Sequence, residues 1–255
     1  MPPVSVTVIT LNEAVHLEAA LQSVRWADEI VVVDSGSTDG TVEIARRFTD
    51  RVVVREWPGY AAQKEHAASL ASHDWIFSID ADERVSEALA AEIRGVLAEE
   101  PREAAFRMPR MTRHFGRWLR TTDAYPDYQV RLYDRRRAHW KPLDVHESVT
   151  ADGQVGTLRA DLLHEGDDTM DARKDKLRHY AKLAATEMHR RGRRGGALAL
   201  VLHPPAAFLR SYVLRRGFLD GAAGFRVSAL QAYYVYMKFA YLRTQNTEYR
   251  TQKPG

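Results

Sequence analysis

The fold class is decided by residues 4–41, which read VSVTVITLNEAVHLEAALQSVRWADEIVVVDSGSTDGT. Residues 4–11 and 29–34 are rich in β-branched side chains and predict two buried strands. Residues 12–23 between them predict a helix with Asn12 as its cap. Two neighbouring strands that are joined through a helix are typical of a parallel sheet, because a parallel connection needs a long crossover.

The same alternation continues along the chain. We expect helices at 41–48, 60–71 and 86–99, the last capped by Ser86, and strands at 51–55 and 75–79. This order predicts an α/β fold, a Rossmann-like domain with a mainly parallel central sheet and helices on both faces.

The pattern changes after residue 105. Further strands are predicted at 105–109, 129–133, 140–149 and 156–163, and helical patterns dominate from residue 170. Residues 110–126 are basic and aromatic and predict a long loop that faces a substrate. The predicted domains are therefore an α/β domain over residues 1–170 and a basic helical extension over 171–255.

Charge is distributed unevenly between these two parts. Residues 1–170 hold 20 Lys and Arg against 29 Asp and Glu, whereas residues 171–255 hold 17 against 5. A basic helical tail predicts an anionic partner such as a membrane surface, a phosphate-rich ligand or nucleic acid. The uncharged stretch 195–209 contains Pro204 and Pro205, so we expect it to be too short and too broken to cross a membrane. Without cysteine, the chain has no disulfide or thiolate chemistry, which suits a reducing cytoplasm.

Two acidic loops follow the second and fourth predicted strands. Asp80 and Asp82 are two residues apart after a buried strand, and such carboxylates can hold Mg²⁺ or Mn²⁺ together with substrate phosphates. Asp34 ends the second strand before a glycine-containing loop and can accept hydrogen bonds from a ribose or a base. In open parallel sheets ligands bind at the carboxyl ends of the strands, which favours a site here. The alternative is a pair of solvated acidic turns that cap the following helices.

Residues 4–41, together with DWIFSIDADERVS at 74–86, resemble the family 2 glycosyltransferases of the GT-A fold. The resemblance is closest to the bacterial lipopolysaccharide core glycosyltransferases. It implies that Thr10, Asn12, Glu13 and Asp34 hold the nucleotide of a nucleotide-sugar donor, and that Asp80 and Asp82 hold the metal-bound diphosphate, Asp82 as metal ligand. It also implies that Lys64 faces the donor, whereas the residue type alone is equally typical of a solvated helix surface.

An inverting sugar transfer needs a carboxylate that takes the proton of the acceptor hydroxyl. The candidates are Asp127 and Glu147, with Asp144 behind them. His164 is predicted as a further metal ligand or phosphate contact and is better placed than His146. Arg131 is expected to meet phosphate or to form an ion pair with Asp127.

The predicted function is a metal-assisted, inverting glycosyltransferase. We expect a UDP-hexose donor, a glycan or lipid-linked acceptor such as lipopolysaccharide core, an anionic membrane surface and no nucleic acid as partners. The predicted location is cytoplasmic, peripheral on the inner face of the cytoplasmic membrane. One alternative is a nucleotidyltransferase that makes nucleotide-sugars, but residues 10–13 lack the glycine-rich phosphate loop of that class. The other alternative is a basic nucleic-acid-binding module, which the tail would explain but the acidic loops would not.

Overall fold

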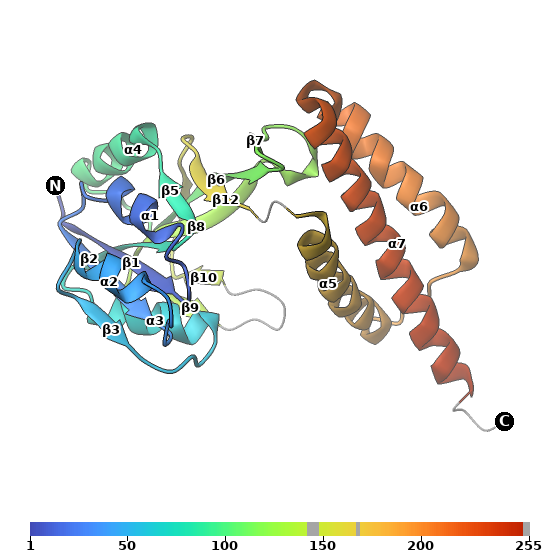
Figure 1. Cartoon of the computed structure of the whole chain (residues 1–255), viewed down its shortest axis with the longest axis horizontal. Helices are drawn as coiled ribbons and strands as arrows, with labels where there is room; N and C mark the ends of the chain where they lie inside the picture. Colours follow the sequence, from blue (N-terminus) through green and yellow to red (C-terminus); the bar gives the residue numbers. More distant parts are fainter. Residues whose placement is uncertain (142–147, 167–168, 252–255) are drawn as a thin grey trace. The chain divides into compact units, whose positions relative to one another are not determined.

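A computed structural model describes residues 1–141, 148–166 and 169–251 (Figure 1). The chain divides into two compact units. The first contains Met1–Met111 and Asp127–Glu165, and the second contains Thr112–Pro126 and Gly166–Gly255. The domain boundary that the sequence predicts, after residue 170, stays a prediction.

The first unit is built on a mixed sheet whose strands follow the order β3-β2-β1-β4-β8-β6-β12-β5, with β11 beside β6. Strand β7 pairs with Arg113 and His114 at the end of β6, within the residues of the second unit. The strands are β1 (Val4–Thr10), β2 (Glu29–Asp34), β3 (Val52–Val54), β4 (Trp75–Asp80), β5 (Glu83–Val85), β6 (Ala105–His114), β7 (Arg117–Trp118), β8 (Asp127–Asp134), β11 (Val155–Thr157) and β12 (Leu162–Glu165). Strands β3, β2, β1 and β4 run parallel to one another, as the strand–helix alternation predicts. Strand β8 then pairs antiparallel with both β4 and β6.

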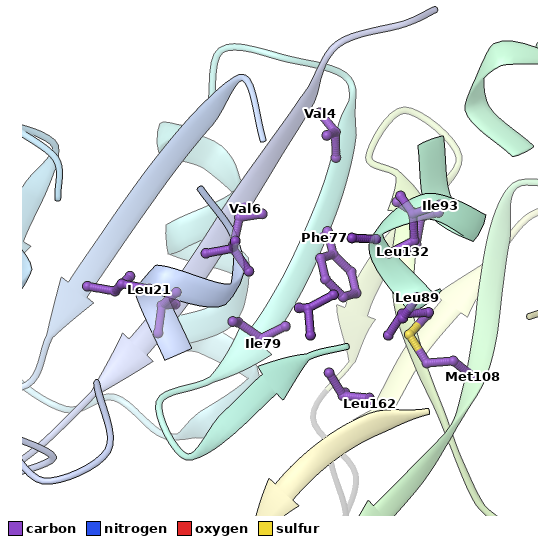
Figure 2. Close-up of a cluster of buried hydrophobic side chains, with 14 of the residues drawn as sticks. Val4, Val6, Leu21, Phe77, Ile79, Leu89, Ile93, Met108, Leu132 and Leu162 are labelled. Carbon is purple, nitrogen blue, oxygen red and sulfur yellow. The ribbon is translucent and has the colours of Figure 1, made fainter. Parts of the chain in front are cut away.

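Helices cover both faces of this sheet (Figure 1). On one face, α1 (Leu17–Ser23), α2 (Thr41–Arg46) and α4 (Glu87–Ala98) enclose a cluster that includes Val6, Phe77 and Ile79. Figure 2 shows side chains from α1, α4 and five strands meeting in this cluster. On the other face lie α3 (Tyr60–Leu70) and a hairpin of β9 (Ala138–Lys141) and β10 (Ser148–Ala151). Both faces are apolar because successive side chains of a strand point to opposite sides of the sheet.

The strand register brings the two acidic loops to one edge of the sheet. Thr10 is paired with Asp34, and Ile9 is paired with Asp80, so the two carboxylate-bearing positions flank the end of β1. Neighbouring strands lie about 4.8 Å apart, which puts the backbones of Asp34 and Asp80 roughly 10 Å apart. The prediction that both loops lie at the carboxyl ends of parallel strands is confirmed.

Two local predictions are wrong. Asn12 does not cap α1, which begins at Leu17. Asn12 instead has a positive φ of 54° and turns back toward the loop after β2. Residues 110–126 are not one loop, because β6 continues to His114 and a short strand, β7, follows it. The cap at Ser86 is confirmed, since its hydroxyl accepts a hydrogen bond from the Leu89 amide at 3.2 Å.

The second unit is helical over its described C-terminal part. It contains α5 (Met170–Arg190), α6 (Ala197–Leu209), η2 (Arg210–Leu214), η3 (Gly217–Asp220) and α7 (Gly221–Thr251), with the short turn η1 (Thr122–Ala124) from the earlier segment. Both α5 and α6 pack along α7 (Figure 1).

The prediction that the uncharged stretch is too short and too broken is also wrong. Pro204 and Pro205 lie inside α6 and do not end it, and the helical path continues through η2. The two prolines remove two backbone donors, yet the helix continues on either side of them. Among the described residues, one helix, Ala197–Leu214, is long and apolar enough to cross a membrane, and 11% of it is buried.

Candidate active site

The loop after β2 is organised by Asp34, which is fully buried. One carboxylate oxygen of Asp34 accepts hydrogen bonds from the backbone amides of Gly36, at 2.9 Å, and Ser37, at 2.8 Å. The other oxygen accepts from the Ser37 hydroxyl. Gly36 has a φ of 89°, a conformation that favours glycine. Asp34 therefore shapes its own loop, and its predicted contact with a nucleotide stays a prediction.

The end of β1 is tied to the same loop. The side-chain oxygen of Asn12 accepts from the Thr38 amide at 2.9 Å, and the Glu13 amide donates to the Thr41 hydroxyl at 2.8 Å. Thr10 is buried, and within the described part of the chain its hydroxyl has no hydrogen-bond partner. The structure thus brings together the four residues that the resemblance assigns to the nucleotide.

Asp80, the last residue of β4, lies between two buried cations. The Lys64 ammonium is 2.9 Å from one of its oxygens, and the Arg131 guanidinium is 2.6 Å from the other. Lys64 is only 1% exposed and lies over the ring of Trp140, at 4.6 Å from the ring centroid. Lys64 is therefore not a solvated helix residue, and it points toward the acidic pair.

These charges determine the ionisation of Asp80. Burial alone would raise the pKa of Asp80, but the charges of Arg131 and Lys64 outweigh burial and hold the pKa well below its ordinary value. Burial alone would lower the pKa of Arg131, but the carboxylates of Asp80 and Glu83 raise it. The two cations thus favour the ionised form of Asp80, with each oxygen in contact with one of them.

The charge network extends from Asp80 toward Asp127. Arg131 also contacts Glu83 at 2.7 Å, and Glu83 is fully buried. Glu83 is 3.3 Å from Arg110, and Arg110 is 2.7 Å from Asp127. The expected ion pair between Arg131 and Asp127 is therefore replaced by one between Arg110 and Asp127.

Asp127 itself is held on both sides. One of its oxygens accepts from two guanidinium nitrogens of Arg110, and the other accepts from the side-chain amide of Gln129 at 2.8 Å. An acceptor hydroxyl would compete with these donors for the carboxylate. The sequence analysis did not predict Glu83 and Arg110 as members of the site. The available signals were that Glu83 is a third acid directly after Asp82 and that Arg110 is a basic residue of β6.

Asp82 follows β4 and lies beside His164 of β12. The Nε2 atom of His164 is 3.2 Å from an Asp82 oxygen, and both side chains are partly exposed. The sequence separates these residues by about eighty positions, and the pairing of β12 with β5 brings them together. The described residues contain no group of three His, Asp or Glu side chains that could hold a metal ion. Glu147, Asp144 and His146 lie outside the described residues.

Comparisons with known proteins identify the family of the chain. The model of the family described as "Glycosyl transferase family 2" matches residues 5–151. The lipopolysaccharide core biosynthesis glycosyltransferase LpsC of Rhizobium meliloti (strain 1021) is 32% identical over 245 residues, which cover 93% of this chain and 91% of the relative. An uncharacterized glycosyltransferase of Rickettsia bellii is 31% identical over 252 residues, which cover 94% of this chain and 86% of the relative.

A solved structure gives the same result for the fold. The mannosyltransferase PcManGT from Pyrobaculum calidifontis, in complex with GDP-Man and Mn²⁺, matches with a TM-score of 0.55 and 18% identity, covering 96% of this chain and 88% of that one. The predicted α/β fold of GT-A type is confirmed. The chain therefore belongs to glycosyl transferase family 2 and is a glycosyltransferase.

Proposed function

We propose that the chain transfers a hexose from a nucleotide-sugar donor to a glycan or lipid-linked acceptor, with inversion at the anomeric carbon and with help from a divalent metal ion. The observation that carries this proposal is the meeting of Asp34, Asp80 and Asp82 at one edge of the parallel strands. The relative LpsC is named for lipopolysaccharide core biosynthesis, which supports an acceptor of that kind.

The residues at this edge fit a donor with a charged diphosphate. Lys64 and Arg131 bring two positive charges to Asp80, next to the position of the diphosphate in our proposal. Because the pyrophosphate group leaves with negative charge, cations held in place before the reaction stabilise its departure.

The residues also fit a divalent ion. Asp82 supplies a carboxylate and His164 an imidazole nitrogen, and the two lie at hydrogen-bonding distance, so both can turn toward one cation. Both oxygens of Asp80 are already bound by cations, so Asp82 is the better ligand of the acidic pair. Mg²⁺ and Mn²⁺ need only a few protein ligands when substrate phosphates complete their coordination. Such an ion, when bound, neutralises the diphosphate.

In the proposed reaction, an acceptor hydroxyl attacks the anomeric carbon and a carboxylate takes its proton. The bond from that carbon to the diphosphate oxygen breaks, and the nucleoside diphosphate leaves with the bonding electron pair. Asp127 and Glu147 are the candidates for the carboxylate. For Asp127 the role requires that Arg110 releases one oxygen when the acceptor binds.

The proposal also covers the nucleotide and the location. A uridine donor follows from the family resemblance, whereas the mannosyltransferase PcManGT was solved with GDP-Man. The enzyme would act at the inner face of the cytoplasmic membrane, where a lipid-linked acceptor is accessible. The basic composition of residues 171–255 supports contact with anionic lipid.

A thermal-shift screen tests the donor site. UDP and GDP are each added with and without Mn²⁺ to the wild type and to Asp82→Asn. We expect one nucleotide to raise the melting temperature only when the metal is present, and we expect the increase to be absent in Asp82→Asn. The matched control is Asp50→Asn, an exposed acid before β3, which should respond like the wild type. An equal response in Asp82→Asn would contradict the assignment.

The base is tested with Asp127→Asn and Glu147→Gln. Loss of transfer with intact nucleotide binding identifies the base, because a general base acts on the acceptor and not on the donor. If both variants transfer sugar at the wild-type rate, neither residue is the base.

A further inference from the structure

The outer face of α6 is apolar and exposed. Its residues are each more than half exposed. We define this outer face by Leu198, Val201, Leu202 and Leu209, with Leu214 at the end of η2. Large exposed apolar patches on soluble proteins mark sites of interaction.

The inner face of α6 already has a partner. The ring of His203 lies 4.6 Å from that of Phe239 in α7, and the ring of Phe208 lies 5.6 Å from that of Phe225. Ala207 between them is buried. The helix therefore has one face that is packed against protein and one that is not, which is the pattern of a helix at a boundary between two environments.

The segment around α6 is also strongly basic. Residues 188–219 contain seven arginines and neither aspartate nor glutamate. Arg193 and Arg194 precede α6, Arg215 and Arg216 follow η2, and all four are exposed. An apolar helix face with arginines at both ends complements an anionic bilayer, because the headgroups of such a bilayer are negatively charged and the acyl chains below them are apolar.

We infer that α6 lies in the interface plane of an anionic membrane, with its outer face against the acyl chains and its flanking arginines among the headgroups. This inference deepens the proposed function, because it names the surface by which the enzyme reaches a lipid-linked acceptor. The partner is a bilayer that contains anionic phospholipid.

A helix that lies in the interface fits the structure better than a helix that spans the bilayer. The run Ala197–Leu214 has 18 residues and would be roughly 27 Å long, close to the hydrocarbon thickness of about 30 Å, so charge and not length distinguishes the two arrangements. It includes Arg210, and its packing partner α7 carries Arg226 and Lys238 in the described region. A span would place these charges in hydrocarbon, whereas an interfacial helix keeps them on the aqueous side.

Vesicle co-sedimentation of the full chain tests the inference. The probes are vesicles of phosphatidylcholine alone and of phosphatidylcholine mixed with phosphatidylglycerol. We expect binding to the anionic vesicles that is at least about tenfold tighter than to the neutral ones and that weakens with salt. Leu202→Glu should reduce the partition coefficient by at least about tenfold, and Leu198→Glu/Leu202→Glu should reduce it further.

Matched controls separate the surface from general effects of charge. Val155→Glu changes an exposed apolar residue of β11 in the same way and should bind vesicles like the wild type. Arg193→Gln/Arg194→Gln should weaken binding to anionic vesicles, whereas Arg46→Gln, an exposed arginine of α2, should not. Circular dichroism of each variant checks that the helices are retained.

Three outcomes would overturn the inference. The first is equal sedimentation of the wild type and Leu198→Glu/Leu202→Glu. The second is resistance of the membrane-bound chain to extraction with alkaline carbonate, because an interfacial helix is released and a spanning one is not. The third is a stable dimer in sedimentation velocity that Leu198→Glu/Leu202→Glu dissociates, since a second copy would then cover the face.

The same variants distinguish this inference from the proposed function. The metal-dependent response to nucleotide is measured on Leu198→Glu/Leu202→Glu in the absence of lipid. If vesicle binding is lost and the response persists, the surface is identified independently of the donor site. If the wild type binds vesicles but no nucleotide, the membrane inference stands and the proposed function fails.

Discussion

Replacement of Arg131 by methionine should destabilise the first unit strongly. Arg131 is 3% exposed and contacts Asp80 at 2.6 Å and Glu83 at 2.7 Å. Removing one partner of a buried ion pair costs about 3–5 kcal/mol, because the remaining charge stays desolvated. In the variant, Glu83 still has Arg110 as an ion-pair partner at 3.3 Å, and Asp80 still has Lys64 at 2.9 Å. We therefore expect a loss at the lower end of this range, about 3 kcal/mol of unfolding free energy.

Urea unfolding followed by tryptophan fluorescence measures this loss. Four of the five tryptophans lie in the first unit, so the signal reports mainly on that unit. Arg47→Met is the matched control, because Arg47 forms an ion pair with Glu18 in which both side chains are more than half exposed. Such a surface pair contributes under about 1 kcal/mol.

A double-mutant cycle with Glu83→Gln makes the test sharper. The backbone amide of Asp80 donates to a Glu83 oxygen at 2.9 Å, and the carbonyl oxygen of the substituted side chain can still accept this bond. The substitution therefore removes mainly the charge. The loss in Arg131→Met/Glu83→Gln should be smaller than the sum of the two single losses by about 1–2 kcal/mol. The buried network does not stabilise the unit if Arg131→Met costs no more unfolding free energy than Arg47→Met. The same conclusion follows if the losses of Arg131→Met and Glu83→Gln simply add in the double variant.

Three further predictions concern other parts of the chain. Gly224→Ala should destabilise the second unit by about 2–3 kcal/mol in urea unfolding, because the new methyl group would collide with the Gly217 carbonyl oxygen, whereas Gly95→Ala in α4 has open space and should stabilise by about 0.5–1 kcal/mol. Ser86→Ala should lower the free energy of unfolding by about 1 kcal/mol through loss of the α4 cap, and an unchanged value would contradict the capping role. Burial alone would raise the pKa of Glu29, but hydrogen bonds from Ser5 and Ser72 and the charge of Arg51 lower it, so its stabilising contribution should be present above the ordinary value of 4.5 and be lost as the pH falls further. The unfolding free energies of the wild type and Glu29→Gln are therefore compared above and below pH 4.5. Their difference should shrink in acid, and a constant difference would refute the assignment.

The sheet could be predicted because its signal is local. Each of β1, β2 and β4 is a short, mainly apolar segment that is followed by a polar loop, and the alternation with helices fixes a parallel arrangement. Once the strands are parallel, their carboxyl ends share one edge. The positions of Asp34, Asp80 and Asp82 at that edge therefore followed from strand order alone.

The partners of these residues could not be predicted in the same way. Lys64, Arg110 and Arg131 reach the acidic residues from α3, β6 and β8, and their sequence distances carry no periodic signal. A charged residue is usually exposed, so the sequence favours a solvated side chain at each position. Asn12 shows the same limit, because its residue type suits a helix cap, yet the adjacent loop offers it the Thr38 amide.

The arrangement of charges separates the roles of the two aspartates that the sequence presents as a pair. Asp80 has both oxygens bound by cations, so a metal ion there would have to displace Lys64 or Arg131 from a buried site. Asp82 is partly exposed, and its described neighbour is a histidine that can ligate a metal when neutral. Two positions apart, one carboxylate thus lies between Lys64 and Arg131, and the other lies beside His164. We therefore propose that Asp80 holds Lys64 and Arg131 in position, and that the metal-dependent part of the proposed reaction depends on Asp82.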